Sequence, residues 1–158
     1  MEARKIGGPL RRSAMKMQQT YYAFNKTRES FLGLNISCAG TPFKRLRGLL
    51  GRLRIGLGEG LWVVPSQGIH TIGMLFPIDV IYLDADGQVV HLVEHLCPFS
   101  FGHICLKSSS LLELPPHTIY ASQTKVGDRI LVCPQAEMET YLASARRLAE
   151  WEEVRQAG

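Results

Sequence analysis

The sequence predicts an α+β domain in which a compact, mostly antiparallel β-sheet curls toward a barrel. Six or more short apolar runs, bounded by turn residues such as Pro65 and Gly87, have the length and spacing of strands. One helix start, Thr41-Pro42, lies among them, and a helical stretch follows Pro134. This class is typical of chains in which short strands outnumber helices. Here we expect one short helix packed on the sheet and another helix at the C-terminus.

The first predicted elements are a strand and the helix that follows it. Residues 31–38 alternate loosely between apolar and polar side chains, as a strand does. Thr41 suits a helix N-cap and Pro42 suits the first helical position. Gly51 would end this helix. One apolar helix face is expected to contain Phe43, Leu46, Leu49 and Leu50.

Further strands alternate with turns along the rest of the chain. Residues 61–64 read as a short buried strand that ends at Pro65, and residues 78–83 and 88–96 read as a hairpin around an Asp-Ala-Asp-Gly turn. Three more short strands are expected at residues 111–114, 118–121 and 129–133. Residues 134–155 have helical character, and we expect this helix to dock on the sheet or to protrude.

The composition fits one domain with a substantial core. The chain has 158 residues, of which 46% are hydrophobic and 20% are charged, and a chain of this size buries roughly 70% of its unfolded surface. Residues 1–57 hold 12 Lys/Arg and 2 Asp/Glu, whereas residues 58–158 hold 6 and 12, so the net charge of +4 divides into +10 and −6. Such a basic half indicates an anion-binding arm or a basic leader on a mildly acidic domain.

These patterns divide the chain into three parts. Residues 1–30 are basic and lack periodicity, which predicts a disordered leader. Residues 31–133 form the predicted β-rich domain, and residues 134–158 form a C-terminal helical appendage. Because Met15 and Met17 lie within the leader, translation can also begin after Met1.

The sequence favours a cytoplasmic location. The four cysteines have no metal-binding or redox spacing. No apolar run approaches the roughly 18 residues of a membrane span, and no signal-peptide core follows the basic N-terminus. We therefore expect reduced thiols and no membrane span, with the oligomeric state left open.

Several separated motifs resemble one known family. Residues 41–52 read TPFKRLRGLLGR, residues 60–86 contain IHTIGMLFPIDV, and residues 112–115 and 126–128 read LELP and VGD. In this order they resemble the bacterial and archaeal family called domain of unknown function 192, over residues 32–132. The resemblance implies a small, mostly antiparallel β fold with a helix packed against it, and it brings no established biochemical activity.

The family's motif residues carry over one by one. They are Arg45, Arg47, Gly48, Leu49, His70, Thr71, Met74, Pro77, Asp79, Glu113 and Asp128. Two positions depart from the family's pattern. Ser66 stands where many relatives with the His-Thr motif have a cysteine, which speaks against a thiol role. His117 replaces the glycine that usually follows Leu-Glu-Leu-Pro-x, which puts the shape of that turn in question.

The motif around His70 is the leading candidate for a ligand site. His70, Thr71, Met74 and Asp79 could converge, because an irregular segment that enters a strand can fold back on it. Imidazole with a thioether suits a soft metal, and imidazole with a carboxylate suits zinc. A buried carboxylate such as Asp79 can equally serve the structure by accepting hydrogen bonds from backbone amides or from an arginine.

Arg45 and Arg47 are the candidate anion ligands, since planar guanidinium groups suit carboxylate or phosphate. The alternative is a solvated helix face with one arginine paired to Asp79 or Glu113. Nucleic acid is disfavoured as a partner, because the sequence has neither a basic sheet face interleaved with aromatic residues nor a recognisable reading helix.

A second cluster, His91, His95 and Cys97, shares the parity of one strand face. Its chemistry suits metal ligation, but a spacing of four strand residues spans about 13 Å, which is too far for two ligands of one metal. These positions are also outside the family motif. No metal site is therefore assigned there, and the sequence identifies no cofactor.

Three hypotheses of function remain. The first is a small binding or accessory protein with a pocket for an anionic or metal ligand at the His70 motif. The second is a hydrolase-type enzyme in which His70 and Asp79 act as acid and base, which requires the two groups to lie within hydrogen-bond reach. The third is an interaction module whose motif only builds the fold.

Overall fold

A computed structural model describes residues 19–157. The strands of this part of the chain are β1 (Tyr21–Asn25), β2 (Ser30–Ala39), β3 (Glu59–Val63), β4 (Ile78–Leu83), β5 (Val89–Leu96), β6 (Ser110–Leu114) and β7 (Ile130–Pro134). The helices are α1 (Pro42–Arg47), α2 (Thr118–Ser122) and α3 (Gln135–Ala157). The predicted α+β class is confirmed, and so is the hairpin formed by β4 and β5.

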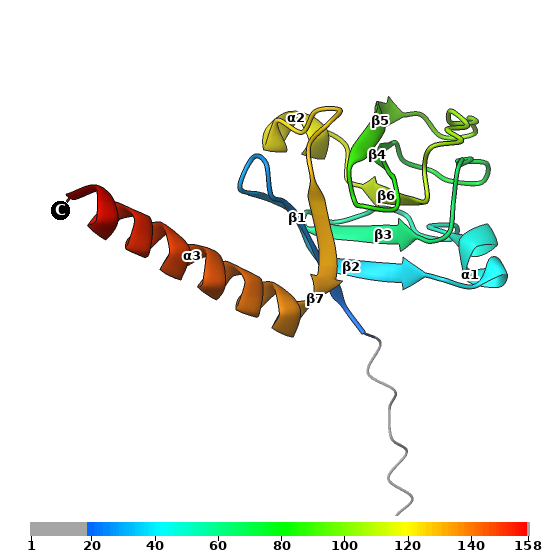
Figure 1. Cartoon of the computed structure of the whole chain (residues 1–158). Coiled ribbons are helices and arrows are strands. Elements are labelled where there is room, and N and C mark those ends of the chain that lie inside the picture. The colour runs from blue at the N-terminus through cyan, green and yellow to red at the C-terminus, as the bar shows by residue number, and fades with distance from the viewer. Residues whose placement is uncertain (1–18, 158) are drawn as a thin grey trace, which may run out of the picture.

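The strands of the described residues form one curled sheet, a half-barrel (Figure 1), in the order β5-β4-β6-β3-β2-β1-β7. All neighbouring pairs are antiparallel except β2 and β3. The two edge strands also approach each other at one corner. There, the amide of Val89 donates to the carbonyl of Asp128, and the amide of Ile130 donates to the carbonyl of Gly87.

Both faces of the central strands are buried. On one face, Ile81 and Leu112 pack against Ile119 of α2. On the other face, Val80 and Leu111 belong to a second apolar cluster that also includes Leu49, just after α1, and Met74. Because successive strand residues point to opposite faces, neighbouring residues of β4 and β6 serve two different cores.

Two predictions about the elements are wrong. Residues 21–30 belong to β1 and the start of β2, whereas the leader was expected to reach residue 30; its first 18 residues lie outside the described part. Tyr21 and Phe24 of β1 pack against Trp62 and Phe31. The basic residues around β1 in the sequence made this apolar packing hard to predict. Residues 118–122 form α2 and not a strand.

The apolar face predicted for the first helix is only partly buried. Helix α1 ends at Arg47, because Gly48 takes a φ of 46°, and none of its own residues is buried. Leu49 and Leu50, in the turn that follows, pack in the core instead. Phe43 and Leu46 are exposed.

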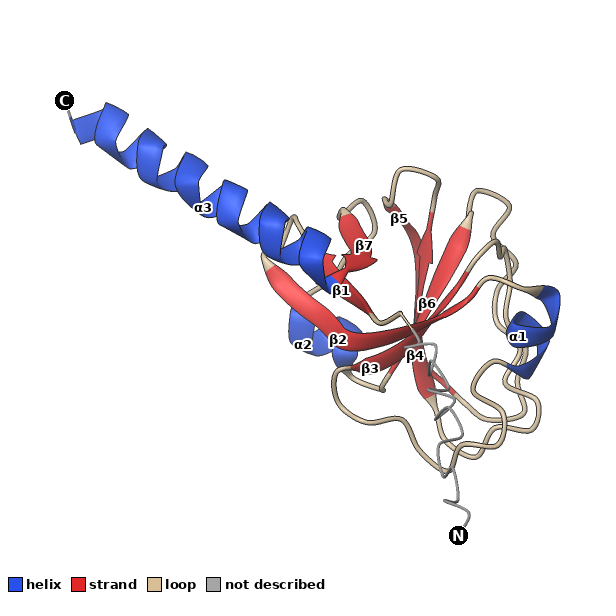
Figure 2. Ribbon diagram, turned by 90° about the horizontal axis from the view of Figure 1, so that it is seen from below, coloured by secondary structure: helices blue, strands red, loops and turns tan. Residues whose placement is uncertain are grey.

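Helix α3 projects from the domain (Figure 2), as one of the two predicted outcomes for residues 134–155. Met138 in its first turns is buried against Phe24 and Cys133, while Leu148 and Trp151 further along are exposed. Within residues 19–157, no helix has the combination of length and apolar character needed to cross a bilayer.

Candidate functional site

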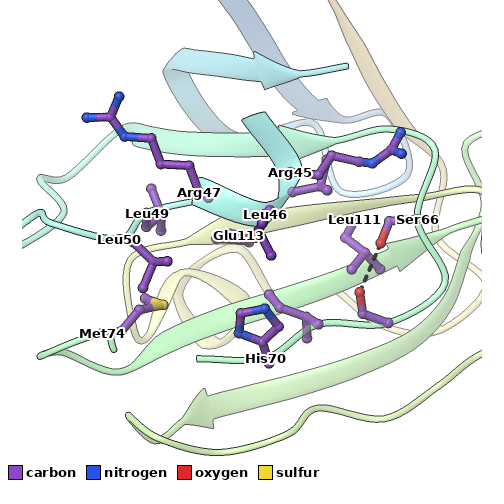
Figure 3. A pocket seen from close by; sticks show the side chains of 14 residues that line it. Arg45, Leu46, Arg47, Leu49, Leu50, Ser66, His70, Met74, Leu111 and Glu113 are labelled. Carbon is purple, nitrogen blue, oxygen red and sulfur yellow. Dashed lines mark hydrogen bonds between the residues drawn. The ribbon is translucent and has the colours of Figure 1, made fainter. Parts of the chain in front are cut away.

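A cavity of about 120 Å³ lies between the α1 segment and the sheet face beneath it (Figure 3). Its volume is comparable to the roughly 150 Å³ of an engineered cavity that holds benzene. Polar and apolar atoms contribute about equally to the walls, and the polar side chains come from three separate segments. The cavity is lined by Arg45, Leu46, Arg47, Gly48, Leu49, Leu50, Val63, Ser66, Gly68, Ile69, His70, Met74, Leu111 and Glu113.

The α1 segment brings two arginines to the cavity. The Thr41 hydroxyl accepts a hydrogen bond from the Lys44 amide and so caps the helix, and Leu49 anchors the following turn in the core. In Figure 3 the side chains of Arg45 and Arg47 extend in opposite directions, and their guanidinium groups point away from each other and from His70. Within the described residues, neither guanidinium group forms an ion pair, so the alternative in which one of them pairs with Asp79 or Glu113 is not observed.

The segment from Ser66 to Met74 forms the opposite wall. Thr71 is fully buried, but its hydroxyl faces the neighbouring loop. It donates to the carbonyl of Cys97 at 2.6 Å and accepts the amide of Ser100 at 2.9 Å. This anchoring leaves the exposed His70 and the buried Met74 lining the cavity. The Ser66 hydroxyl donates to the carbonyl of Gly68.

Glu113 of β6 is the unusual group of the site. It is 5% exposed, and no hydrogen bond to its side chain occurs among residues 19–157. Its carboxyl group is not completely enclosed, because the fully buried side-chain N or O atom without a partner in this part of the chain is Trp62 Nε1. Burial raises the pKa of its carboxyl group from 4.5 to about 8. Near neutral pH the group is therefore mostly protonated, and it can both donate and accept a hydrogen bond within the cavity.

Asp79 does not reach this cavity. Its two carboxylate oxygens accept the amides of His95 and Ile119, each at 2.9 Å. It pairs with Leu114 in the sheet, whereas Glu113 pairs with Val80, so the two carboxyl groups point to opposite faces. The pairing of His70 with Asp79 that the hydrolase hypothesis requires is absent, because the Asp79 carboxylate is held on the α2 side of the sheet.

The side chains of His91, His95 and Cys97 do not form a common site. A bulge in β5 breaks the alternation between them, and His95 adopts a φ of 54°. The His91 ring lies 4.5 Å from the ring of His103, whereas the His95 ring lies 5.9 Å from that of His117. Among the described residues, no group of three or more His, Cys, Asp or Glu side chains is arranged to hold a metal ion.

The structure thus brings together Arg45, Arg47, His70 and Met74 of the predicted site, and it separates Thr71 and Asp79 from them. Sequence reasoning did not place Glu113 in the candidate site, although the residue was part of a recognised motif. The available signal was a single acid in the apolar run Leu-Leu-Glu-Leu-Pro. Burial of an acid in such a strand costs folding free energy unless the acid is hydrogen-bonded or paired, so its presence indicates a partner or a site.

Comparisons with known proteins agree with this fold. The sequence model of a family described as Uncharacterized ACR, DUF192, matches residues 23–132. A protein from Sinorhizobium meliloti, provisionally described as a transcription regulator, has a similar structure. The TM-score is 0.61 at 18% identity, over 74% of this chain and 97% of that one. A protein of unknown function from Novosphingobium aromaticivorans gives 0.61 at 17% identity, over 70% and 82%. No curated protein matches the chain.

Proposed function

The chain belongs to the DUF192 family, and from the cavity that its motif residues line we propose that it binds a small organic anion. The observation that supports this most directly is Glu113, a buried carboxyl group with no hydrogen-bond partner among residues 19–157. It lines the same cavity as Arg45 and Arg47, and neither arginine is ion-paired within that part of the chain. A polar group left in this state costs folding free energy, and a ligand that hydrogen-bonds to it would offset that cost.

The chemistry of the lining residues defines the ligand class. Arg45 and Arg47 offer guanidinium groups that suit a carboxylate. The protonated carboxyl group of Glu113 suits a hydroxyl or carbonyl group at the other end of the ligand. The apolar side chains among the lining residues, such as Leu49 and Leu111, favour a short carbon chain between these polar groups. A cavity of about 120 Å³ limits the enclosed part to a few non-hydrogen atoms.

The proposal is tested by thermal shifts with acetate, lactate, pyruvate, succinate and inorganic phosphate. A ligand present at about 100 times its Kd stabilises the folded state by about 2.7 kcal/mol. For a chain of this size that corresponds to a rise in Tm of roughly 5–10 °C. The expected result is a rise with at least one carboxylate, and no rise with any of the five probes would refute the proposal.

Variants connect the shift to the cavity. Arg45→Gln and Glu113→Leu are expected to remove it, whereas Glu113→Gln, which keeps a neutral donor and acceptor, is expected to retain most of it. Arg54→Gln is the matched control, because Arg54 is an exposed arginine near α1 that does not line the cavity. An equal loss in Arg54→Gln would assign the binding to general positive charge.

A further inference from the structure

The segments around the cavity make up one end of the molecule, which we call the basic end. It comprises residues 41–57, 66–77 and 97–107, and it lies opposite α3 in Figure 1. The first two segments share the cavity. The last two are joined by backbone hydrogen bonds, including one from the amide of Cys105 to the carbonyl of Gln67 at 2.8 Å.

The basic end has a one-sided composition. Its three segments contain no Asp or Glu. Their positive residues are Lys44, Arg45, Arg47, Arg52, Arg54 and Lys107. Of these side chains, only Arg52 has an ion-pair partner within the described residues, namely Glu59 just outside the basic end. A surface with this composition attracts anions over the range of a Debye length, about 10 Å at moderate salt.

Large apolar side chains are exposed on the same three segments, with exposed fractions from 45% to 95%. They are Phe43, Leu46, Leu53, Leu57, Ile72, Leu75, Phe99, Phe101, Ile104 and Leu106. Isolated exposed apolar residues are ordinary, but a concentration of them on one end of a domain is a sign of an interaction surface.

We propose that the basic end docks on the surface of an anionic lipid membrane. Its lysines and arginines would contact the headgroups, and its Phe, Leu and Ile side chains would enter the boundary of the acyl chains, the combination that interfacial binding uses. The apolar side chains come from three separate loops, which a fluid interface accommodates without a matching shape. A symmetric contact between two copies would instead place two acid-free, positive surfaces against each other.

The test is co-sedimentation of the full chain with vesicles of phosphatidylcholine alone or mixed with phosphatidylserine. We expect binding only to the mixed vesicles, and weaker binding as salt is raised. Removal of two charges in Lys44→Gln/Arg54→Gln should weaken binding about fivefold per charge. Removal of apolar contact in Phe101→Ser/Ile104→Ser should weaken it about tenfold or more. None of these four residues lines the cavity.

Matched changes on α3 provide the control. Arg146→Gln/Arg147→Gln and Leu148→Ser/Trp151→Ser remove the same kinds of exposed side chain from the opposite end, and they should leave binding within about twofold of the parent. Residues 1–18 are present in every variant, so their contribution is constant. Melting curves verify that each variant is folded.

Three outcomes would overturn the proposal. One is the absence of binding to the phosphatidylserine vesicles at low salt. Another is an equal loss in the variants of α3. The third is binding that depends on charge alone. In that case soluble polyglutamate would displace the vesicles equally well from the parent and from Phe101→Ser/Ile104→Ser, which would assign the basic end to an acidic protein partner.

Discussion

Replacement of Glu113 by glutamine is expected to change how folding stability depends on pH. Burial raises the pKa of this carboxyl group from 4.5 to about 8. Between these pH values the folded chain keeps a proton that the unfolded chain has released, so stability falls as pH rises. At 1.36 kcal/mol per pKa unit, the rise in pKa from 4.5 to about 8 corresponds to a loss of folding free energy of about 5 kcal/mol across this pH range. Glutamine cannot ionise and avoids the loss.

The assay is urea unfolding of the parent and of Glu113→Gln at intervals from pH 4.5 to about pH 9. Subtracting the two unfolding free energies at each pH cancels the contribution of every other titrating group. The variant should gain on the parent steadily as pH rises and exceed it by several kcal/mol at the upper end. Glu94→Gln, at an exposed position of β5, is the control and should show no such trend. A difference that does not change with pH would refute the reasoning, because Glu113 would then titrate alike in the folded and unfolded chains.

Two further predictions concern other buried carboxylates. Asp79→Ala should lower the free energy of unfolding by about 2–5 kcal/mol, because the partly buried amide of His95 and the buried amide of Ile119 lose their acceptor. A loss below about 1 kcal/mol in urea unfolding would contradict this. Burial raises the pKa of Asp128, but hydrogen bonds, first that from Arg28, outweigh burial and hold it below 3.8. The stability this provides is present above pH 3.8 and is lost as pH falls through the folded pKa. Asp128→Asn should therefore be less stable at neutral pH and decline less toward acid, and acid-unfolding curves that match the parent would contradict this.

The fold could be predicted where the determining signals are local. The turn at residues 84–87 is determined by its own residues. Gly87 adopts a φ of 76°, and the Asp84 side chain accepts the amides of Asp86 and Gln88. The segment after His117 was misassigned because Thr118 and Ile119 favour strands by propensity. Its conformation is decided by tertiary contacts, including the hydrogen bond from the Ile119 amide to Asp79.

The candidate site could be predicted only in part, for a geometric reason. The motif pointed to segments that line the cavity, so Arg45 and His70 were among the residues named from the sequence. Which carboxyl group joins them depends on strand register, and a change of one residue reverses the face of every side chain. Asp79 was in the more conspicuous motif. However, Glu113 pairs with Val80, so the Glu113 side chain lies on the sheet face that lines the cavity, and Asp79 lies on the opposite face.

The existence of the cavity follows from the one parallel pair of strands. Antiparallel neighbours can be joined by a tight turn, whereas parallel neighbours need a crossover of a dozen or more residues. The link from β2 to β3, residues 40–58, is that crossover, and it carries α1 over the sheet face. Leu49, Leu50 and Ile55 of this link pack against the core, while the side chains of α1 itself stay out of it. The parallel pair therefore places the α1 segment over this sheet face. Because the side chains of α1 do not fill the space between the segment and the sheet, a cavity remains there.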